Sequence, residues 1–363
     1  MSRTAKKLLL FAGSCLIQMM VLLDVCAQQT GQKSTAEDTL KIETTLVSVP
    51  VIVSDRQGRY ISGLKAEDFT LYEDHVKRQI DFFADTEEAI NVALLLDTSK
   101  STTMVLDDIK KAAKDFIKQL RPQDRAMIAS FDFEAQALSE LTSDRKTLER
   151  AINKARIGEQ FGTKLRDAVF AVMKDEFKSV KGRKAIVLLT DGKDFGSQIS
   201  EQTLIENAAE ADALIYSIFY TSLPKTIRRT PGGQGGGRVI PRGRGGGIFT
   251  PRFPPPRQRP DKEDQRQRRN GRIQQRNEVA INFLQELSEV SAGRYFNSQV
   301  TDLKKTFTQI VEELRHQYRL GFYPPDHQPG SIHNLRVEVA QSDVAVRSRR
   351  TYRISDDSKA DRQ

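Results

Sequence analysis

The sequence predicts an α/β protein in which a doubly wound, mostly parallel sheet is inserted in a small β-sandwich. Between residues 89 and 317, apolar runs of strand length alternate with amphipathic helical patterns, which is typical of a parallel sheet covered on both faces. Before and after that range the apolar pattern is that of short strands. Neither end has enough strands for a stable sheet, so we expect both ends to share one sandwich, with two separate β-lobes as the alternative.

The first 27 residues have the features of a signal peptide. A basic start is followed by a long apolar run and a small-residue cleavage site. We therefore expect an exported protein, periplasmic or extracellular after cleavage near Ala27/Gln28. An uncleaved anchor and a lipid on Cys26 are the alternatives. Since Cys15 and Cys26 are the two cysteines, the mature chain has no thiol for disulfides, catalysis or metal binding.

The N-terminal portion of the mature chain is predicted to be a polar leader followed by strands. Residues 28–39 are polar and lack a core, so they form a flexible leader. Residues 40–88 form the N-terminal half of the β-sandwich. Their apolar patterns predict strands at 42–53, 69–72 and 79–83, with a polar turn at 73–75.

Residues 89–317 form the predicted α/β domain. Apolar runs predict strands at 92–96, 126–131, 135–141, 184–190 and 214–220, and a short edge strand at 294–296. Apolar residues three and four apart predict helices at 105–120, 144–155, 165–173, 200–211, 279–290 and 303–314. The alternation of the two patterns defines the doubly wound sheet.

One segment of this domain, residues 222–277, has a different composition. Gly, Pro, Arg and Gln dominate it, with fifteen Lys and Arg residues against three Asp and Glu. It has too few aliphatic side chains to offset its chain entropy and is predicted to be a disordered insert. Its net charge of +12 exceeds the +9 of the whole chain, so the basicity belongs to this segment and not to the folded surface.

The C-terminal portion returns to a β pattern. Residues 318–355 form the C-terminal half of the β-sandwich, with strands predicted at 318–323, 335–339 and 344–354. Residues 356–363 are a polar tail.

Oxygen-bearing side chains cluster where two buried strands end and one helix begins. They are Asp97, Ser99 and Ser101 after the strand at 92–96, Thr163 at a helix start, and Asp191 after the strand at 184–190. Because parallel strands end at one edge of a sheet, these side chains can meet there. An all-oxygen set suits a hard cation, here Mg²⁺, with Mn²⁺ or Ca²⁺ as alternatives.

Each of these features alone has a simpler interpretation. Asp97 to Ser101 fits a solvated turn, Thr163 a helix N-cap, and Asp191 with Gly192 a tight turn. Their order and their positions at strand and helix ends favour the metal site.

The motif Asp97-Thr98-Ser99-Lys100-Ser101, with Thr163 and Asp191-Gly192 downstream, resembles the metal-ion-dependent adhesion site (MIDAS) of the von Willebrand factor type A (VWA) domain. The resemblance covers residues 91–317 apart from the insert, and the flanking strands resemble bacterial VWFA-related exported proteins. It implies a Rossmann-like fold and a cation held by Asp97, Ser99, Ser101, Thr163 and Asp191, some of them through water. It also implies a partner protein whose Asp or Glu fills an open coordination position.

These features predict an exported, divalent-cation-dependent protein-binding module for adhesion or assembly, and not an enzyme. A metal-dependent hydrolase of phosphate or ester substrates is the alternative, but no histidine lies near the motif loops to act as a base. Residues 222–277 offer a second alternative, the binding of an anionic envelope polymer or lipid. Specific nucleic-acid binding is not expected, because the Arg-Gly segment has only two aromatic residues.

Overall fold

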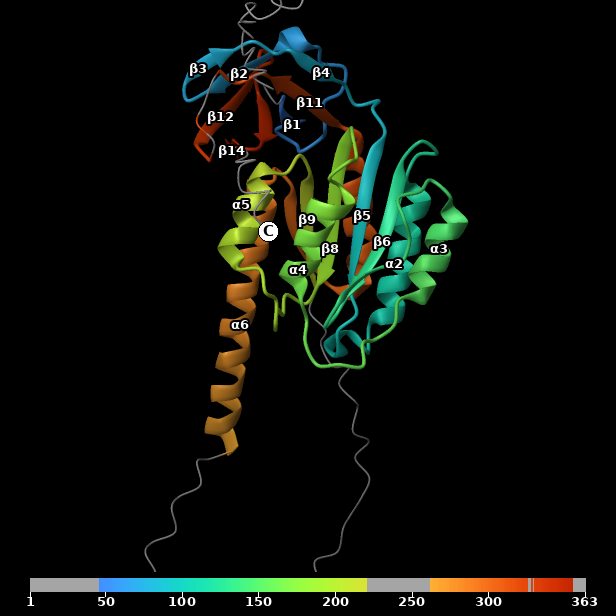
Figure 1. Cartoon of the computed structure of the whole chain (residues 1–363). Helices are drawn as coiled ribbons and strands as arrows, with labels where there is room; N and C mark the ends of the chain where they lie inside the picture. Colours follow the sequence, from blue (N-terminus) through green and yellow to red (C-terminus); the bar gives the residue numbers. More distant parts are fainter. Residues whose placement is uncertain (1–45, 221–261, 326–327, 329, 355–363) are drawn as a thin grey trace, which may run out of the picture. The chain divides into compact units, whose positions relative to one another are not determined.

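The computed structural model in Figure 1 describes residues 46–220, 262–325, 328 and 330–354. The predicted signal peptide, leader and polar tail lie outside these residues, as do residues 222–261 of the predicted insert. Among the described residues, no helix combines the length and hydropathy needed to cross a membrane.

A six-stranded sheet forms the centre of the α/β domain. Its strands are β5 (Ile90–Asp97), β6 (Arg125–Phe131), β7 (Ala135–Ala137), β8 (Arg183–Thr190), β9 (Leu214–Tyr220) and β10 (Arg294–Ser298). They lie in the order β10-β9-β8-β5-β6-β7, and all neighbours are parallel except β7, which is antiparallel to β6. Every residue of β5 is buried, as expected for a central strand covered on both faces.

Helices cover both faces of this sheet (Figure 1). They are α2 (Leu106–Gln119), α3 (Arg145–Lys154), α4 (Leu165–Ala171), α5 (Glu201–Glu210), α6 (Lys262–Val290) and α7 (Leu303–Arg315). The apolar sides of α2, α3 and α7 share one core cluster with the sheet, and those of α4, α5 and α6 share the other. The predicted doubly wound fold is confirmed. A π-helical turn, Val172–Glu176, directly continues α4.

The N- and C-terminal strands form one β-sandwich. Its strands are β1 (Val47–Asp55), β2 (Phe69–Glu73), β3 (Val76–Arg78), β4 (Phe82–Ala84), β11 (Gln317–Phe322), β12 (Ile332–Val339), β13 (Val344–Ser348) and β14 (Thr351–Arg353). The two sheets have the orders β13-β1-β11-β4 and β14-β12-β2-β3. Each sheet mixes early and late strands, so the alternative of two separate lobes is wrong. Their apolar faces enclose a third core cluster.

The strand predicted at 344–354 is divided in the structure. Its first half, β13, pairs with β1, whereas its second half, β14, pairs with β12 in the other sheet. Arg349 lies at the crossing and is buried, with Nη1 donating to the Ser48 carbonyl at 3.0 Å. The chain changes sheets here, so the uninterrupted strand is corrected to two.

The predicted insert is also corrected at its C-terminal end. Residues 262–277 belong to α6 and are helical, whereas the composition of 222–277 predicted disorder throughout. The Pro-rich stretch ends at Pro260, and the Lys, Glu, Gln and Arg residues that follow have high helix propensity. The second half of α6 contributes Phe283, Leu284 and Leu287 to the core.

Candidate metal centre

The predicted ligands lie on three loops at the carboxyl edge of the central sheet. The first follows β5, the second precedes α4 and the third follows β8. Leu96 of β5 is the register partner of Leu189 of β8, so Asp97 and Thr190 end their strands at the same level. The amino ends of these strands face the sandwich, since Arg183 donates from Nη1 to the Gln317 carbonyl of β11 at 2.8 Å. The ligand loops are therefore at the other end of the sheet.

The first loop presents one buried carboxylate and two neighbouring hydroxyls. Asp97 is fully buried, and its Oδ1 accepts the Ser99 backbone N–H at 2.9 Å. A 3₁₀ turn, Lys100–Thr102, then brings the Ser101 hydroxyl within 2.9 Å of the Ser99 hydroxyl. The Ser99 hydroxyl makes no capping bond to that turn. Ser99 therefore does not cap this turn with its side chain.

The third loop joins the first through a residue that the sequence analysis did not select. Thr190 donates from Oγ1 to Asp97 Oδ2 at 2.9 Å and accepts the Gly192 N–H at 2.9 Å. Gly192 has φ +77, and a Cβ there would lie 2.9 Å from the Phe219 ring, so only glycine makes this turn without strain. Asp191 is buried, and its Oδ2 pairs with Lys193 Nζ.

The second loop is tied to both of the others. Thr163 is buried, and its backbone pairs with Phe195 of the third loop through two hydrogen bonds of 3.1 and 2.8 Å. The Gly158 N–H donates to the Thr98 carbonyl of the first loop at 3.0 Å. The N-cap of α4 is Lys164, without a side-chain bond, so Thr163 is not the cap. The backbone pairing thus places Thr163 beside the third loop.

Asp132 is a further acid of this edge that the sequence analysis missed. It follows β6, and its Oδ2 accepts the Thr98 hydroxyl at 3.2 Å. A Cβ on Gly158 would lie 2.4 Å from its carboxyl group, so the second loop passes directly over it. Phe131-Asp132 repeats the pattern of Leu96-Asp97 and Thr190-Asp191, in which a strand ends in an acid. This pattern is the sequence signal that could have identified Asp132. Its contacts indicate that it positions the first and second loops.

The electrostatics of the edge favour a cation. Burial, and next the negative charge of Asp191, raise the pKa of Asp97 to about 6, although the bonds from Ser99 and Thr190 lower it. The same two carboxylates act on Tyr220, whose pKa is raised mainly by burial and whose buried hydroxyl has no hydrogen-bond partner among the described residues. Two buried carboxylates thus interact, and the exposed Lys193 pairs with one of them, Asp191.

The donor set fits a hard divalent cation. It offers carboxylate and hydroxyl oxygens, which Mg²⁺ prefers over nitrogen or sulfur ligands. Within the described ranges there is no group of three or more His, Cys, Asp or Glu residues placed to hold a metal. The predicted site has two carboxylates, and its other donors are hydroxyls. The described histidines lie elsewhere: His333, for example, pairs with Asp74 in the sandwich.

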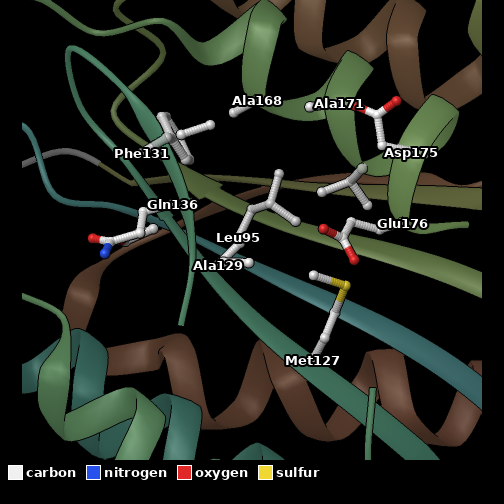
Figure 2. A pocket seen from close by; sticks show the side chains of 13 residues that line it. Leu95, Met127, Ala129, Phe131, Gln136, Ala168, Ala171, Asp175 and Glu176 are labelled. Carbon is white, nitrogen blue, oxygen red and sulfur yellow. The ribbon is translucent and has the colours of Figure 1, made fainter. Parts of the chain in front are cut away.

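A separate small pocket lies on the α4 side of the sheet (Figure 2). It encloses about 90 Å³. Leu95 and Met127 of the central strands line it, and Asp175 and Glu176 of the π-helical turn carry carboxyl groups beside it (Figure 2). None of the five predicted metal ligands lines this pocket, so it is not part of the metal centre.

A match to a family model agrees with this assignment of the fold. Residues 92–193 match the family model of the von Willebrand factor type A domain. All five predicted ligands lie in this range, so the part of the chain that carries them is similar to VWA domains. No curated protein matches the chain.

Several solved structures resemble the chain at low identity. Proximal thread matrix protein 1 from the mussel byssus, with a zinc-occupied MIDAS motif, is 14% identical, with a TM-score of 0.44 over 68% of this chain and 50% of that one. The conserved hypothetical protein BatB from Bacteroides thetaiotaomicron is 17% identical (TM-score 0.41, 62% and 98% covered). A von Willebrand factor type A protein from Catenulispora acidiphila is 9% identical (TM-score 0.42, 88% and 76% covered). The chain spans about half the length of the byssus protein.

Proposed function

We propose that this protein is an exported binding module that recognises an Asp or Glu side chain of a partner protein through a divalent cation at the carboxyl edge of its sheet. The observation that carries the proposal is the state of Asp97. This carboxylate is fully buried, and its two oxygens accept hydrogen bonds from Ser99 and Thr190. The negative charge of Asp191 acts on it and raises its pKa. Such a pair is stable when a cation compensates it.

The proposed cation is Mg²⁺, held by Asp97, Ser99, Ser101, Thr163 and Asp191, directly or through water. When bound, it would allow a further carboxylate to coordinate, since the two protein carboxylates leave no surplus negative charge at the cation to repel it. The chain's own groups fix the site. Ser99 N–H and the Thr190 hydroxyl orient Asp97, and the pairing of Thr163 with Phe195 holds the second loop against the third.

A hydrolase is the competing proposal for the same residues. Hydrolysis at a metal requires a group that moves a proton, and no described histidine lies on the three loops. We therefore propose recognition rather than turnover. The two functions differ in a direct assay, since a hydrolase would consume generic phosphate or ester substrates at a rate that depends on Asp97.

The test is a cation-dependent pull-down from envelope extract with the purified mature protein. We expect a partner that is retained in Mg²⁺, released by EDTA and not captured by Asp97→Ala. Equal capture by Asp97→Ala, or capture that EDTA does not reverse, would contradict the proposal. N-terminal sequencing of the exported protein tests the predicted cleavage before Gln28.

A further inference from the structure

Three large apolar side chains on the metal-centre loops are unusually exposed. Met104 is 72% exposed, Phe161 82% and Phe195 77%. They are the three most exposed large hydrophobic residues in the described part of the chain. Each lies within four residues of a predicted ligand: Met104 after Ser101, Phe161 before Thr163 and Phe195 after Asp191. We call these three residues the apolar rim.

Contacts between the loops hold the two aromatic residues of the rim close to the predicted ligands. Lys100 of the first loop places Nζ 3.7 Å from the centroid of the Phe161 ring on the second loop. Phe195 of the third loop pairs through its backbone with Thr163, two residues from Phe161. The aromatic rings are therefore fixed to loops that meet at the metal centre, although neither ring is buried in the core. Exposed apolar groups clustered in this way mark interaction surfaces.

Three lysines lie on the same loops as the rim. Lys100 and Lys193 are exposed, and Lys193 pairs with Asp191. Lys164, next to Thr163, places Nζ 4.8 Å from the centroid of the Phe133 ring. Together with a bound cation, three lysines favour an acidic partner and disfavour a basic one. The rim adds apolar area, which favours a partner that also presents apolar side chains.

We propose that the apolar rim selects protein segments in which an Asp or Glu is flanked by large apolar residues. This inference rests on the proposed function, because the acid is placed by the cation. Apolar flanks packed on Phe161, Phe195 and Met104 would bury aromatic surface. They would also exclude water around the carboxylate, which strengthens its interaction with the centre. The rim thus distinguishes one acidic segment from another, which the five ligands alone do not.

The experiment selects displayed random peptides on the immobilised mature protein in Mg²⁺, with elution by EDTA. The inference predicts that eluted peptides are enriched in Asp or Glu with large apolar residues beside it. Enrichment in acids without apolar neighbours would overturn the role of the rim and leave the proposed function intact. No EDTA-dependent enrichment would overturn both.

Variants of the rim then test the residues themselves with the selected peptide. We expect Phe161→Ser and Phe195→Ser each to weaken its binding by about 5- to 10-fold, as for aromatic anchors of interfaces, with Mg²⁺ affinity unchanged. Phe161→Leu should recover most of the affinity. The matched control is Ile332→Ser, a 62% exposed residue of β12 in the sandwich, which should have no effect. Unchanged binding in both rim variants, or an equal loss in the control, would contradict the inference.

Discussion

Two buried carboxylates of this molecule differ in the source of the positive charge that compensates them. Glu313 of α7 is 1% exposed. Its carboxylate pairs with Arg347 and lies 3.7 Å from Arg294 Nη1, and it accepts the Tyr60 hydroxyl at 3.1 Å. The burial of Tyr60, and next the charge of Glu313, raise the pKa of that tyrosine to about 12. The chain itself thus supplies the cations that this buried acid requires.

Asp97 is as deeply buried as Glu313, but the groups around it are different. Within the described residues, its oxygens accept hydrogen bonds from neutral groups of Ser99 and Thr190, and its charged neighbour is a second acid, Asp191. A buried charge without a cation in the chain is costly. The comparison separates a structural acid, whose charge is compensated by arginines of the chain, from an acid that in our proposal receives an external cation.

The largest predicted effect comes from replacing Asp97 by an isosteric amide. Asp97→Asn should lower Mg²⁺ affinity by at least about 100-fold, since even groups that only orient a metal ligand typically contribute roughly 10- to 100-fold. In EDTA the variant should be as stable as the wild type or more stable, because a repelled, desolvated charge is removed. Calorimetric titration with MgCl₂ and urea unfolding in EDTA measure the two effects. A large loss of stability in EDTA would show that Asp97 is a structural acid after all.

The pH dependence of stability in EDTA sharpens the same contrast. The folded-state pKa of Asp97, about 6, is above its ordinary value of 3.8. The folded protein therefore binds the Asp97 proton more tightly than the unfolded chain does. Protonated Asp97 contributes its full stabilisation of the fold below about pH 4, and this contribution is lost as the pH rises through 6. The expected loss is about 2 to 3 kcal/mol.

Other carboxyl groups also make stability depend on pH, including Asp74 and Asp144, whose pKa values are lowered by hydrogen bonds and which therefore act below about pH 4. The quantity to measure is therefore the wild-type free energy of unfolding minus that of Asp97→Asn, at about pH 4.5 and about pH 7. A difference that stays constant between the two pH values would contradict the assignment of the raised pKa to Asp97.

Replacing the structural acid should have the opposite pattern. Glu313→Gln should cost about 2 kcal/mol of stability, less than for a fully buried pair because Arg347 and Arg294 are partly exposed. Mg²⁺ affinity should be unchanged, since the residue lies at the sandwich end of the molecule, beside Tyr60. Thermal unfolding and calorimetric titration test both effects. A loss of Mg²⁺ binding in this variant would remove the distinction between the two acids.

The smallest predicted effect concerns Lys193. Its Nζ pairs with Asp191 Oδ2, so it competes with a cation for that oxygen and repels it. Lys193→Gln should raise Mg²⁺ affinity by about 3- to 5-fold, the scale of an exposed ion pair. The matched control is Lys184→Gln at the amino end of β8, where Lys184 pairs with Asp212 at 3.2 Å. Reduced affinity in Lys193→Gln, or an equal increase in the control, would contradict the account.

Much of the sheet was predictable because its elements carry local patterns. The continuous apolar runs of β5, β8 and β9 predict buried parallel strands, and a strand that ends in an acid places that acid at the sheet edge. Asp97 and Asp191 follow from this rule. Asp132 follows from it too and was missed, because no hydroxyl motif accompanies it.

Other features depend on contacts that no local pattern records. Tyr60 and Glu313 are 253 positions apart in the chain and meet only in the folded protein. Arg349 lies between β13 and β14, and its side chain reaches Ser48 in β1, which is 301 positions away in the chain. In the first half of α6, two local rules conflicted: the composition of the insert indicated disorder, whereas side-chain propensity favoured a helix.

The most direct test of the central claim is anomalous X-ray scattering from crystals of the mature protein grown with Mn²⁺. The account predicts one strong peak at the carboxyl edge of the sheet, about 2 Å from oxygens of the first and third loops, the usual distance of such ions from their ligands. It also predicts that the peak is absent from Asp97→Asn crystals. A peak at another site, or one that persists in the variant, would contradict the claim that Asp97 and Asp191 are buried to hold a cation.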